Sequence, residues 1–101
     1  MAKPVRKDPS LALYHTILKL KDIDECVRFF EDLCTVSELQ EMSRRMHAAR
    51  MLKSNYIYSE IAEQTGLSTA TISRVNRCLK YGSDGYLTVL DRLERMDRRR
   101  G

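Results

Sequence analysis

Apolar residues recur every three or four positions along most of this chain, the spacing that places them on one face of an α-helix. The predicted helices span roughly residues 8–18, 22–34, 35–54, 58–65, 68–80 and 86–96. Asp8 reads as an N-cap and Pro9 as the first helical residue. Two capping-box patterns, 22–25 and 35–38, mark the next two starts. The pattern therefore predicts an all-α fold of six helices with no strand.

The first two predicted helices carry wide apolar stripes. These stripes consist of Leu11, Tyr14, Ile17 and Leu18, followed by Ile23, Cys26, Val27, Phe30, Leu33 and Cys34. They are more extensive than the short downstream part of a 101-residue chain can cover alone. We therefore expect a second copy of the chain to cover them, in a homodimer.

Length and composition suit one small domain. Hydrophobic residues make up 43% of the chain and charged residues 32%. The start is polar and basic, unlike a secretory signal, and no apolar run approaches the roughly 20 residues of a membrane span. We expect a cytoplasmic protein with a flexible arm at 1–7, a helical domain at 8–97 and a basic tail at 98–101. The net charge of +4 mildly favours an anionic partner.

The sequence offers little for catalysis or metal binding. Cys26, Cys34 and Cys78 are odd in number and match no paired spacing, which indicates buried, reduced thiols. His47 with Cys26 or Cys34 has no recognised metal-ligand spacing. There is no phosphate-binding glycine loop, no defensible carboxylate pair and no nucleophile with a placed base. We expect neither an enzyme nor a metalloprotein.

Residues 58–80 have the pattern of a helix-turn-helix. Its requirements are met by buried-face Ile61, small Ala62 at the helix crossing, Gly66 in the turn, the apolar anchor Leu67, and Ile72 with Val75 on the second helix. Glycine suits the turn because it takes positive φ without steric cost. Helical hairpins with a glycine in the turn are common, so neither Ala62 nor Gly66 alone would distinguish a helix-turn-helix from an ordinary hairpin. All the requirements are met in register.

The second helix of this motif presents a face suited to double-stranded DNA. Ser68 is placed to cap it by accepting a backbone N–H from near Thr71. The predicted outward residues are Thr69, Ala70, Ser73, Arg74 and Arg77. Small side chains at the start let the helix approach base edges, and arginine holds phosphate or guanine. The alternative is a protein-interaction module, which the lack of large apolar anchors disfavours.

Three segments resemble the Trp repressor family, with the greatest likeness to its YerC/YecD branch. They are TVSELQEM, EIAEQTGLSTATISRVNRCLKYG and GYLTVLDRL. The resemblance covers about residues 10–96, and the central segment is its specific part. It implies an all-helical, intertwined homodimer in which the first two helices and the last interlock between subunits.

The resemblance also implies roles for particular residues. The family's DNA-reading positions fall on Ser68, Thr69, Ala70, Thr71 and Ser73, with Arg77 near the backbone. The tryptophan repressor binds its corepressor between two arginines. One matches Arg74, for which a phosphate contact is the favoured role, and the other falls on Arg44 or Arg45. Together with Cys78 these arginines form a candidate effector pocket.

Two departures from the family pattern argue against tryptophan as the effector. Val75 replaces a glycine that lies beside the indole in tryptophan-binding members, and its branched side chain would crowd the pocket. Cys78 replaces a serine and is a weaker hydrogen-bonding partner. Another small effector, or none, stays open, and no cofactor is predicted. The sequence thus predicts a transcriptional regulator, most simply a repressor.

Overall fold

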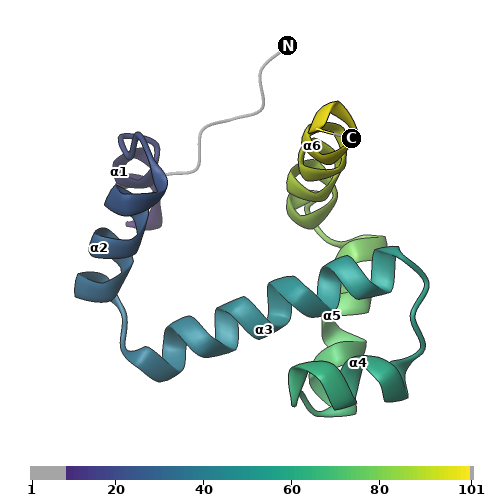
Figure 1. Cartoon of the computed structure of the whole chain (residues 1–101). Helices are drawn as coiled ribbons and strands as arrows, with labels where there is room; N and C mark the ends of the chain where they lie inside the picture. Colours follow the sequence, from purple (N-terminus) through teal and green to yellow (C-terminus); the bar gives the residue numbers. More distant parts are fainter. Residues whose placement is uncertain (1–8, 101) are drawn as a thin grey trace. The chain divides into compact units, whose positions relative to one another are not determined.

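The computed structural model describes residues 9–100, and in this range it contains helices and no strand (Figure 1). The six helices are α1 (Ser10–Ile17), α2 (Ile23–Leu33), α3 (Val36–Lys53), α4 (Tyr58–Thr65), α5 (Thr69–Tyr81) and α6 (Gly85–Arg100). The predicted all-α class with six helices is confirmed.

The helix ends agree with the predictions in the middle of the chain and differ near its two ends. Helix α4 has the predicted bounds, and α5 follows Ser68 at its N-cap. Pro9 is the N-cap of α1 rather than its first helical residue, and Asp8 lies outside the described residues.

Helix α6 continues through Arg100, so residues 98–100 are helical rather than a tail. Nothing in that stretch stops a helix before Gly101. The arm predicted at 1–7 also lies outside the described residues.

The predicted cap of α2 is present with a changed partner. The Asp22 side chain accepts a hydrogen bond from the Glu25 backbone N–H at 2.9 Å. Glu25 Oε1 accepts from the Lys21 backbone N–H at 2.9 Å, one residue earlier than a capping box requires. The Glu25 carboxylate therefore binds the backbone N–H of the residue before the N-cap rather than that of the N-cap residue itself.

The described chain divides into two units, and the first contains α1 and α2. Neither helix has a buried residue. Large apolar side chains are exposed on both helices and at the C-cap of α1, namely Leu13, Tyr14, Leu18, Ile23, Val27 and Leu33. Phe29 and Phe30 meet edge to face with their ring centroids 5.3 Å apart. The single chain therefore leaves these apolar faces largely uncovered.

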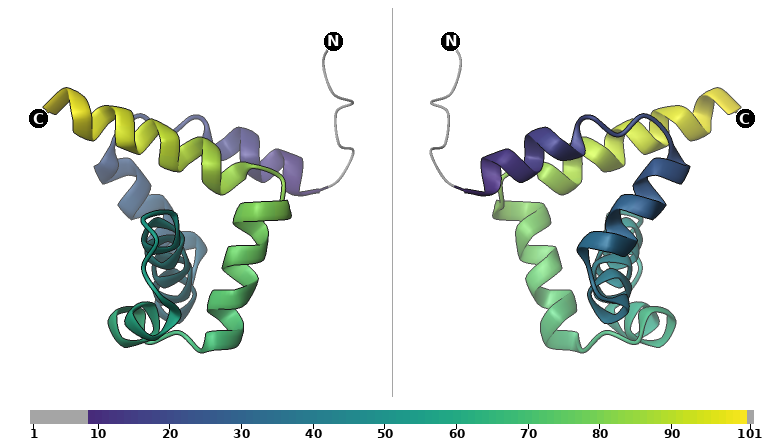
Figure 2. Two further views of the ribbon diagram at one scale, coloured as in Figure 1. Left: turned by 90° about the vertical axis from the view of Figure 1, so that its right-hand side faces the viewer. Right: turned by 90° about the vertical axis from the view of Figure 1, so that its left-hand side faces the viewer.

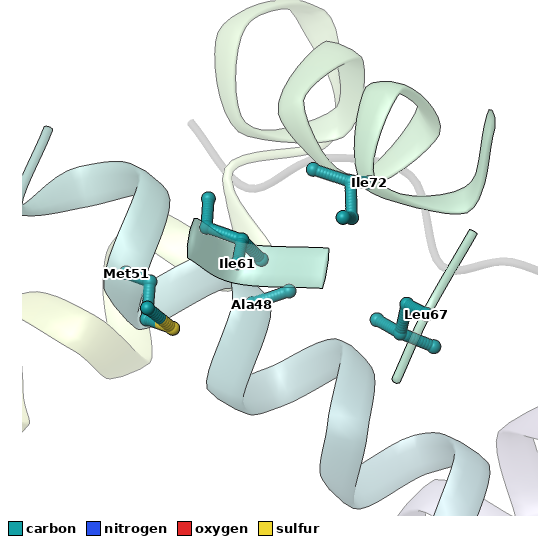
Figure 3. Close-up of a cluster of buried hydrophobic side chains, with 5 residues drawn as sticks. All are labelled: Ala48, Met51, Ile61, Leu67 and Ile72. Atoms are coloured by element: carbon teal, nitrogen blue, oxygen red, sulfur yellow. The ribbon is translucent and has the colours of Figure 1, made fainter. Parts of the chain in front are cut away.

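The second unit, residues 37–101, contains two buried clusters. The first consists of Ala48, Met51, Ile61, Leu67 and Ile72, and Figure 3 shows these side chains gathered between α3, α4 and α5. The second consists of Ala49, Val75, Leu79 and Leu90. Ala48 and Ala49 are adjacent on α3 and completely buried, one in each cluster. Their small side chains let α3 lie close to both groups.

Helix α6 leaves α5 at the end opposite the α4–α5 turn (Figure 2). Two ion pairs join α6 to α3: Lys53 Nζ lies 3.2 Å from Glu94 Oε1, and Arg50 Nη2 lies 3.6 Å from Asp97 Oδ2. At least one partner of each pair is more than half exposed, so the buried Leu90 contributes more to the contact than the ion pairs do. Within the described residues no helix has the length and apolar character needed to cross a membrane.

Candidate nucleic-acid interface

The α4–turn–α5 segment has the geometry that the sequence predicted. Ile61 and Ile72 are completely buried, and Leu67 and Val75 are 6% and 3% exposed. Ala62 is partly buried against the first cluster. Gly66 adopts φ 74° and donates its N–H to Ala62 O at 2.9 Å. The helix-turn-helix is thus held by its own core.

Thr65 contributes to the turn in a way that the sequence analysis did not identify. The buried Thr65 hydroxyl donates to Ile61 O at 2.7 Å, and Thr65 Oγ1 accepts the Leu67 N–H at 3.2 Å. These two bonds satisfy polar groups on both sides of Gly66, because an unpaired N–H or C=O there would be costly to bury. The position of a threonine directly before the turn glycine is the sequence feature that could have indicated these hydrogen bonds.

Helix α5 exposes the residues that the sequence placed outward. Thr69, Ala70, Ser73, Arg74 and Arg77 are all exposed. The opposite face is buried and no acidic residue occurs in the helix. The free N–H groups and the partial positive charge at its start favour an anion such as phosphate. The exposed face therefore combines small side chains near the start with arginines further along.

Ser68 and Thr71 differ from the other predicted DNA-reading residues because they bond to each other. Ser68 Oγ accepts the Thr71 N–H at 3.1 Å, and the Ser68 hydroxyl donates to Thr71 Oγ1 at 3.0 Å. Thr71 is half-buried, whereas Ser68 is exposed. Ser68 Oγ therefore caps the backbone at the start of α5, and the Thr71 hydroxyl bonds the capping side chain. Thr69, Ala70 and Ser73 are left as the small exposed side chains.

A cavity of about 220 Å³ lies beside α5. It is lined by Glu41 and Arg45 from α3, Thr71, Arg74, Val75 and Cys78 from α5, and Tyr86 from α6. The structure thus brings Arg45, Arg74 and Cys78 together, while the exposed Arg44 does not line the cavity. Nε of Arg45 is buried and has no hydrogen-bond partner in the described chain.

Val75 forms part of the cavity wall and at the same time belongs to the second buried cluster. Its side chain therefore occupies space that a glycine at this position would leave open. Two guanidinium groups and one carboxylate line the cavity, so its ionisable lining carries a net positive charge. The arrangement suits an occupant rich in hydrogen-bond acceptors.

Other candidate chemistry is not assembled in the described residues. No cluster of three or more His, Cys, Asp or Glu side chains that could hold a metal ion occurs there. Cys26, Cys34 and Cys78 are free and half-buried rather than fully buried. Glu60 accepts the Ile57 N–H at 3.3 Å, a structural role at the start of α4.

The profile of the Trp repressor protein family matches residues 10–94, which include the whole helix-turn-helix. The chain belongs to the Trp repressor family. It is 54% identical over 82 residues to the uncharacterized protein YerC of Bacillus subtilis, covering 81% of this chain and 79% of that protein. The resemblance to the YerC branch is thereby confirmed.

Two crystal structures of Trp repressor-like proteins have a similar fold. A TrpR-like protein from Eubacterium eligens is 54% identical with a TM-score of 0.80, covering 83% of this chain and 87% of the other. A candidate Trp repressor from Staphylococcus aureus is 46% identical with a TM-score of 0.82, covering 87% and 89%. Membership of the Trp repressor family supports a helix-turn-helix regulator in general terms.

Proposed function

We propose that this chain is a sequence-specific DNA-binding regulator of transcription, acting as a repressor in the cytoplasm, with α5 in the major groove. The observation that carries this proposal is the exposed face of α5, where Thr69, Ala70 and Ser73 precede Arg77 without an intervening acidic residue. Short side chains allow the helix to approach base edges closely. The buried cores on the other side hold α5 in place for that contact.

Arg74 and Arg77 supply the positive charge of this interface. Both side chains are exposed, and neither forms an ion pair in the described chain. Arg77 is proposed to bind the DNA backbone, a contact that adds affinity without reading sequence. Arg74 lies where it can contact phosphate or the neighbouring cavity.

The proposed active form is an intertwined homodimer. Support comes from α1 and α2, which have no buried residue and expose five large apolar side chains in the single chain. Covering such surface with a second copy is favourable, because removing apolar area from water is worth roughly 25 cal/mol per Å². Two recognition helices in successive major grooves would lie about 34–36 Å apart on a two-fold-related site.

The cavity lined by Arg45, Arg74 and Cys78 is proposed as the site of a small-molecule effector. Tryptophan fits this proposal poorly, because Val75 fills space on the wall and a thiol replaces a stronger hydrogen-bonding hydroxyl. An effector here would contact α3, α5 and α6 together. Its occupancy would therefore influence how α5 is held.

Matched alanine variants separate the recognition of a particular DNA sequence from the affinity for DNA of any sequence. Ser73→Ala is expected to change which sequences are preferred, whereas Arg77→Ala should weaken binding to all sequences by a similar factor. Ser83→Ala and Arg92→Ala make the same changes at exposed positions outside α4 and α5. Binding is measured on selected and random duplexes at one salt concentration.

Equal affinity of the wild-type chain for selected and random DNA would argue strongly against specific regulation. The competing interpretation is a protein-interaction module. It would gain support if a protein partner protected the exposed face of residues 68–77 from labelling and DNA did not.

A further inference from the structure

A groove of about 320 Å³ lies between α3 and α4, and it shares no lining residue with the cavity beside α5. Three of its lining side chains, His47, Arg50 and Ser54, come from α3. They are three and four residues apart, so they lie on one side of that helix. The volume is within the range of small-molecule sites, roughly 300–1,000 Å³.

The way in which α3 ends places an aromatic ring in this groove. Asn55 adopts φ 68°, and its N–H donates to Leu52 O at 3.0 Å. The Tyr56 N–H donates to Met51 O at 3.1 Å. These two bonds form a Schellman motif, which turns the chain back against the last turn of the helix. Tyr56 and Met51 both line the groove, and they are 46% and 6% exposed. The groove therefore has a fixed apolar part.

The rest of the lining is polar and contains no carboxylate. Four of its polar side chains form no hydrogen bond or ion pair within the described chain, and these are His47, Ser54, Tyr56 and Gln64. An imidazole, two hydroxyls and an amide can each donate a hydrogen bond. The groove thus offers several donors and suits a ligand rich in acceptors.

Arg50 supplies the positive charge of the groove. Its Nη2 lies 3.6 Å from Asp97 Oδ2, and Asp97 is outside the lining. This separation is longer than the 2.7–2.9 Å typical of a charge-assisted hydrogen bond, and a guanidinium has five N–H donors. Arg50 therefore retains donors for a second acceptor. Its planar fork matches phosphate, and His47 lies one helical turn before it.

We propose that the groove between α3 and α4 binds a nucleotide, with the phosphate on Arg50 and His47 and the base against Tyr56. The groove is larger than a phosphate alone requires, and bases stack on aromatic rings. Ser54 and Gln64 supply hydrogen bonds to the remaining polar groups of the ligand. A bound nucleotide would join α3 to the first helix of the helix-turn-helix. This inference goes beyond the proposed DNA-binding function and does not depend on it.

Adenosine 5′-monophosphate is a suitable probe, because it carries both parts of the ligand. The full-length chain is titrated with it at constant ionic strength, and the resonances are followed by NMR. We expect saturable shifts at the Ser54, Tyr56 and Gln64 amides and at the Arg50 Nε–H. Shifts confined to the rest of the chain, or none at millimolar nucleotide, would overturn the proposal.

The two halves of the probe test its two contacts separately. Adenosine lacks the phosphate and inorganic phosphate lacks the base, so each should bind more weakly than the nucleotide. Phosphate that binds as tightly as the nucleotide would remove the contact with Tyr56, and adenosine that does so would remove the contact with Arg50. Either result would contradict a nucleotide site.

A variant at Arg50 tests the phosphate contact. Arg50→Met should weaken nucleotide binding about tenfold, as expected for losing hydrogen bonds to a charged group. Arg92→Met is the matched control, because Arg92 is an exposed arginine of α6 outside this groove, and it should leave the affinity unchanged. Circular dichroism checks that both variants fold. Equal affinity of the folded Arg50→Met chain and the wild type would contradict the proposed phosphate contact.

Variants at Tyr56 test the base contact. Tyr56→Leu should weaken nucleotide binding about fivefold through the loss of stacking, whereas Tyr56→Phe keeps the ring and should retain most of the affinity. Tyr81→Leu makes the same change at a residue that is 82% exposed and outside the groove. If Tyr56→Leu does not fold, Tyr56→His replaces it with a smaller ring and should give an intermediate affinity. A leucine variant that binds as well as the wild type would contradict stacking on Tyr56.

A competition experiment distinguishes the two sources of a nucleotide. Displacement of the bound mononucleotide by a short single-stranded oligodeoxyadenylate identifies a nucleic-acid strand as the ligand, whereas no displacement identifies a free nucleotide. The same preparation is tested for binding to the selected duplex. A chain that binds the duplex but not the nucleotide overturns this inference alone. A chain that binds the nucleotide but no selected DNA removes the proposed function and leaves the nucleotide site standing.

Discussion

The α1–α2 unit and the α3–α6 unit differ in what their apolar residues contact. In the second unit, residues such as Ile61 and Ile72 are completely buried within the same chain. In the first unit, stripes of the same helical spacing remain uncovered, and Ile23 is 80% exposed. Periodicity therefore shows which face of a helix is apolar but not which molecule covers it. The helix-turn-helix has its core within one chain, whereas α1 and α2 have no buried residue in the single chain.

The largest effect is expected from opening the core of the complete unit. Ile72→Ala should lower the free energy of unfolding by about 2–5 kcal/mol, through lost apolar burial and the cavity left behind. Ile57→Ala is the matched control, because Ile57 is 62% exposed, and it should change stability by less than about 1 kcal/mol. Denaturant unfolding followed by circular dichroism measures both. Equal effects would show that the buried cluster does not hold the motif.

A charge on α2 tests whether the uncovered unit meets a second copy. Val27→Asp should weaken dimerisation by about 2 kcal/mol per chain, because it places an unpaired carboxylate in an apolar contact. His47→Asp makes an equal change in charge at an exposed position of α3 and should leave the dimer intact. Sedimentation at several protein concentrations gives the dissociation constant. A wild-type chain that stays monomeric at high micromolar concentration would contradict the homodimer.

The backbone of the turn gives a smaller and more local effect. Gly66→Ala should cost about 1–2 kcal/mol, because φ 74° is unfavourable for a residue with a Cβ. No atom lies within 4 Å of the added Cβ, so the cost is conformational rather than a clash. Gly85→Ala also meets open space but lies at the start of α6 without a positive φ, and it should be neutral or slightly stabilising. Thermal unfolding of the two variants compares them directly.

The smallest effect concerns the cap of the recognition helix. Ser68→Ala should lower stability by about 1 kcal/mol, since the Thr71 N–H loses its acceptor. Ser83→Ala, in the exposed segment between α5 and α6, should change stability by only a few tenths of a kcal/mol. Amide hydrogen exchange at Thr71 gives a second readout, and unchanged protection there would argue against the cap.

The helix-turn-helix was predictable because its signals are local. Ala62, Gly66 and the apolar positions around them are separated by short, fixed distances, and the structure places each as expected. The all-α class followed from the helical period for the same reason. The sequence does not predict the end of α6, because no glycine or proline marks a stop before Gly101 and a run of arginines is compatible with either a helix or a tail.

The cavity needed three-dimensional information. The sequence could not choose between Arg44 and Arg45, since a shift of one residue along α3 rotates the side chain by about 100°. Only the packing of α3 against α5 and α6 places Arg45 in the lining. The pairing of Ser68 with Thr71 was similarly hidden, because the sequence showed the cap but not where the second hydroxyl points.

The most direct test of the central claim is selection of DNA by the full-length chain. Purified protein is incubated with fragmented genomic DNA at near-physiological salt, and the bound fragments are sequenced. We predict an enriched motif of two related half-sites about 10 base pairs apart from centre to centre, weakened by Arg77→Ala and altered by Ser73→Ala. Recovery of fragments without an enriched motif would contradict a sequence-specific regulator. An enriched motif that is bound equally well by the wild type and by both variants would contradict the proposed role of α5.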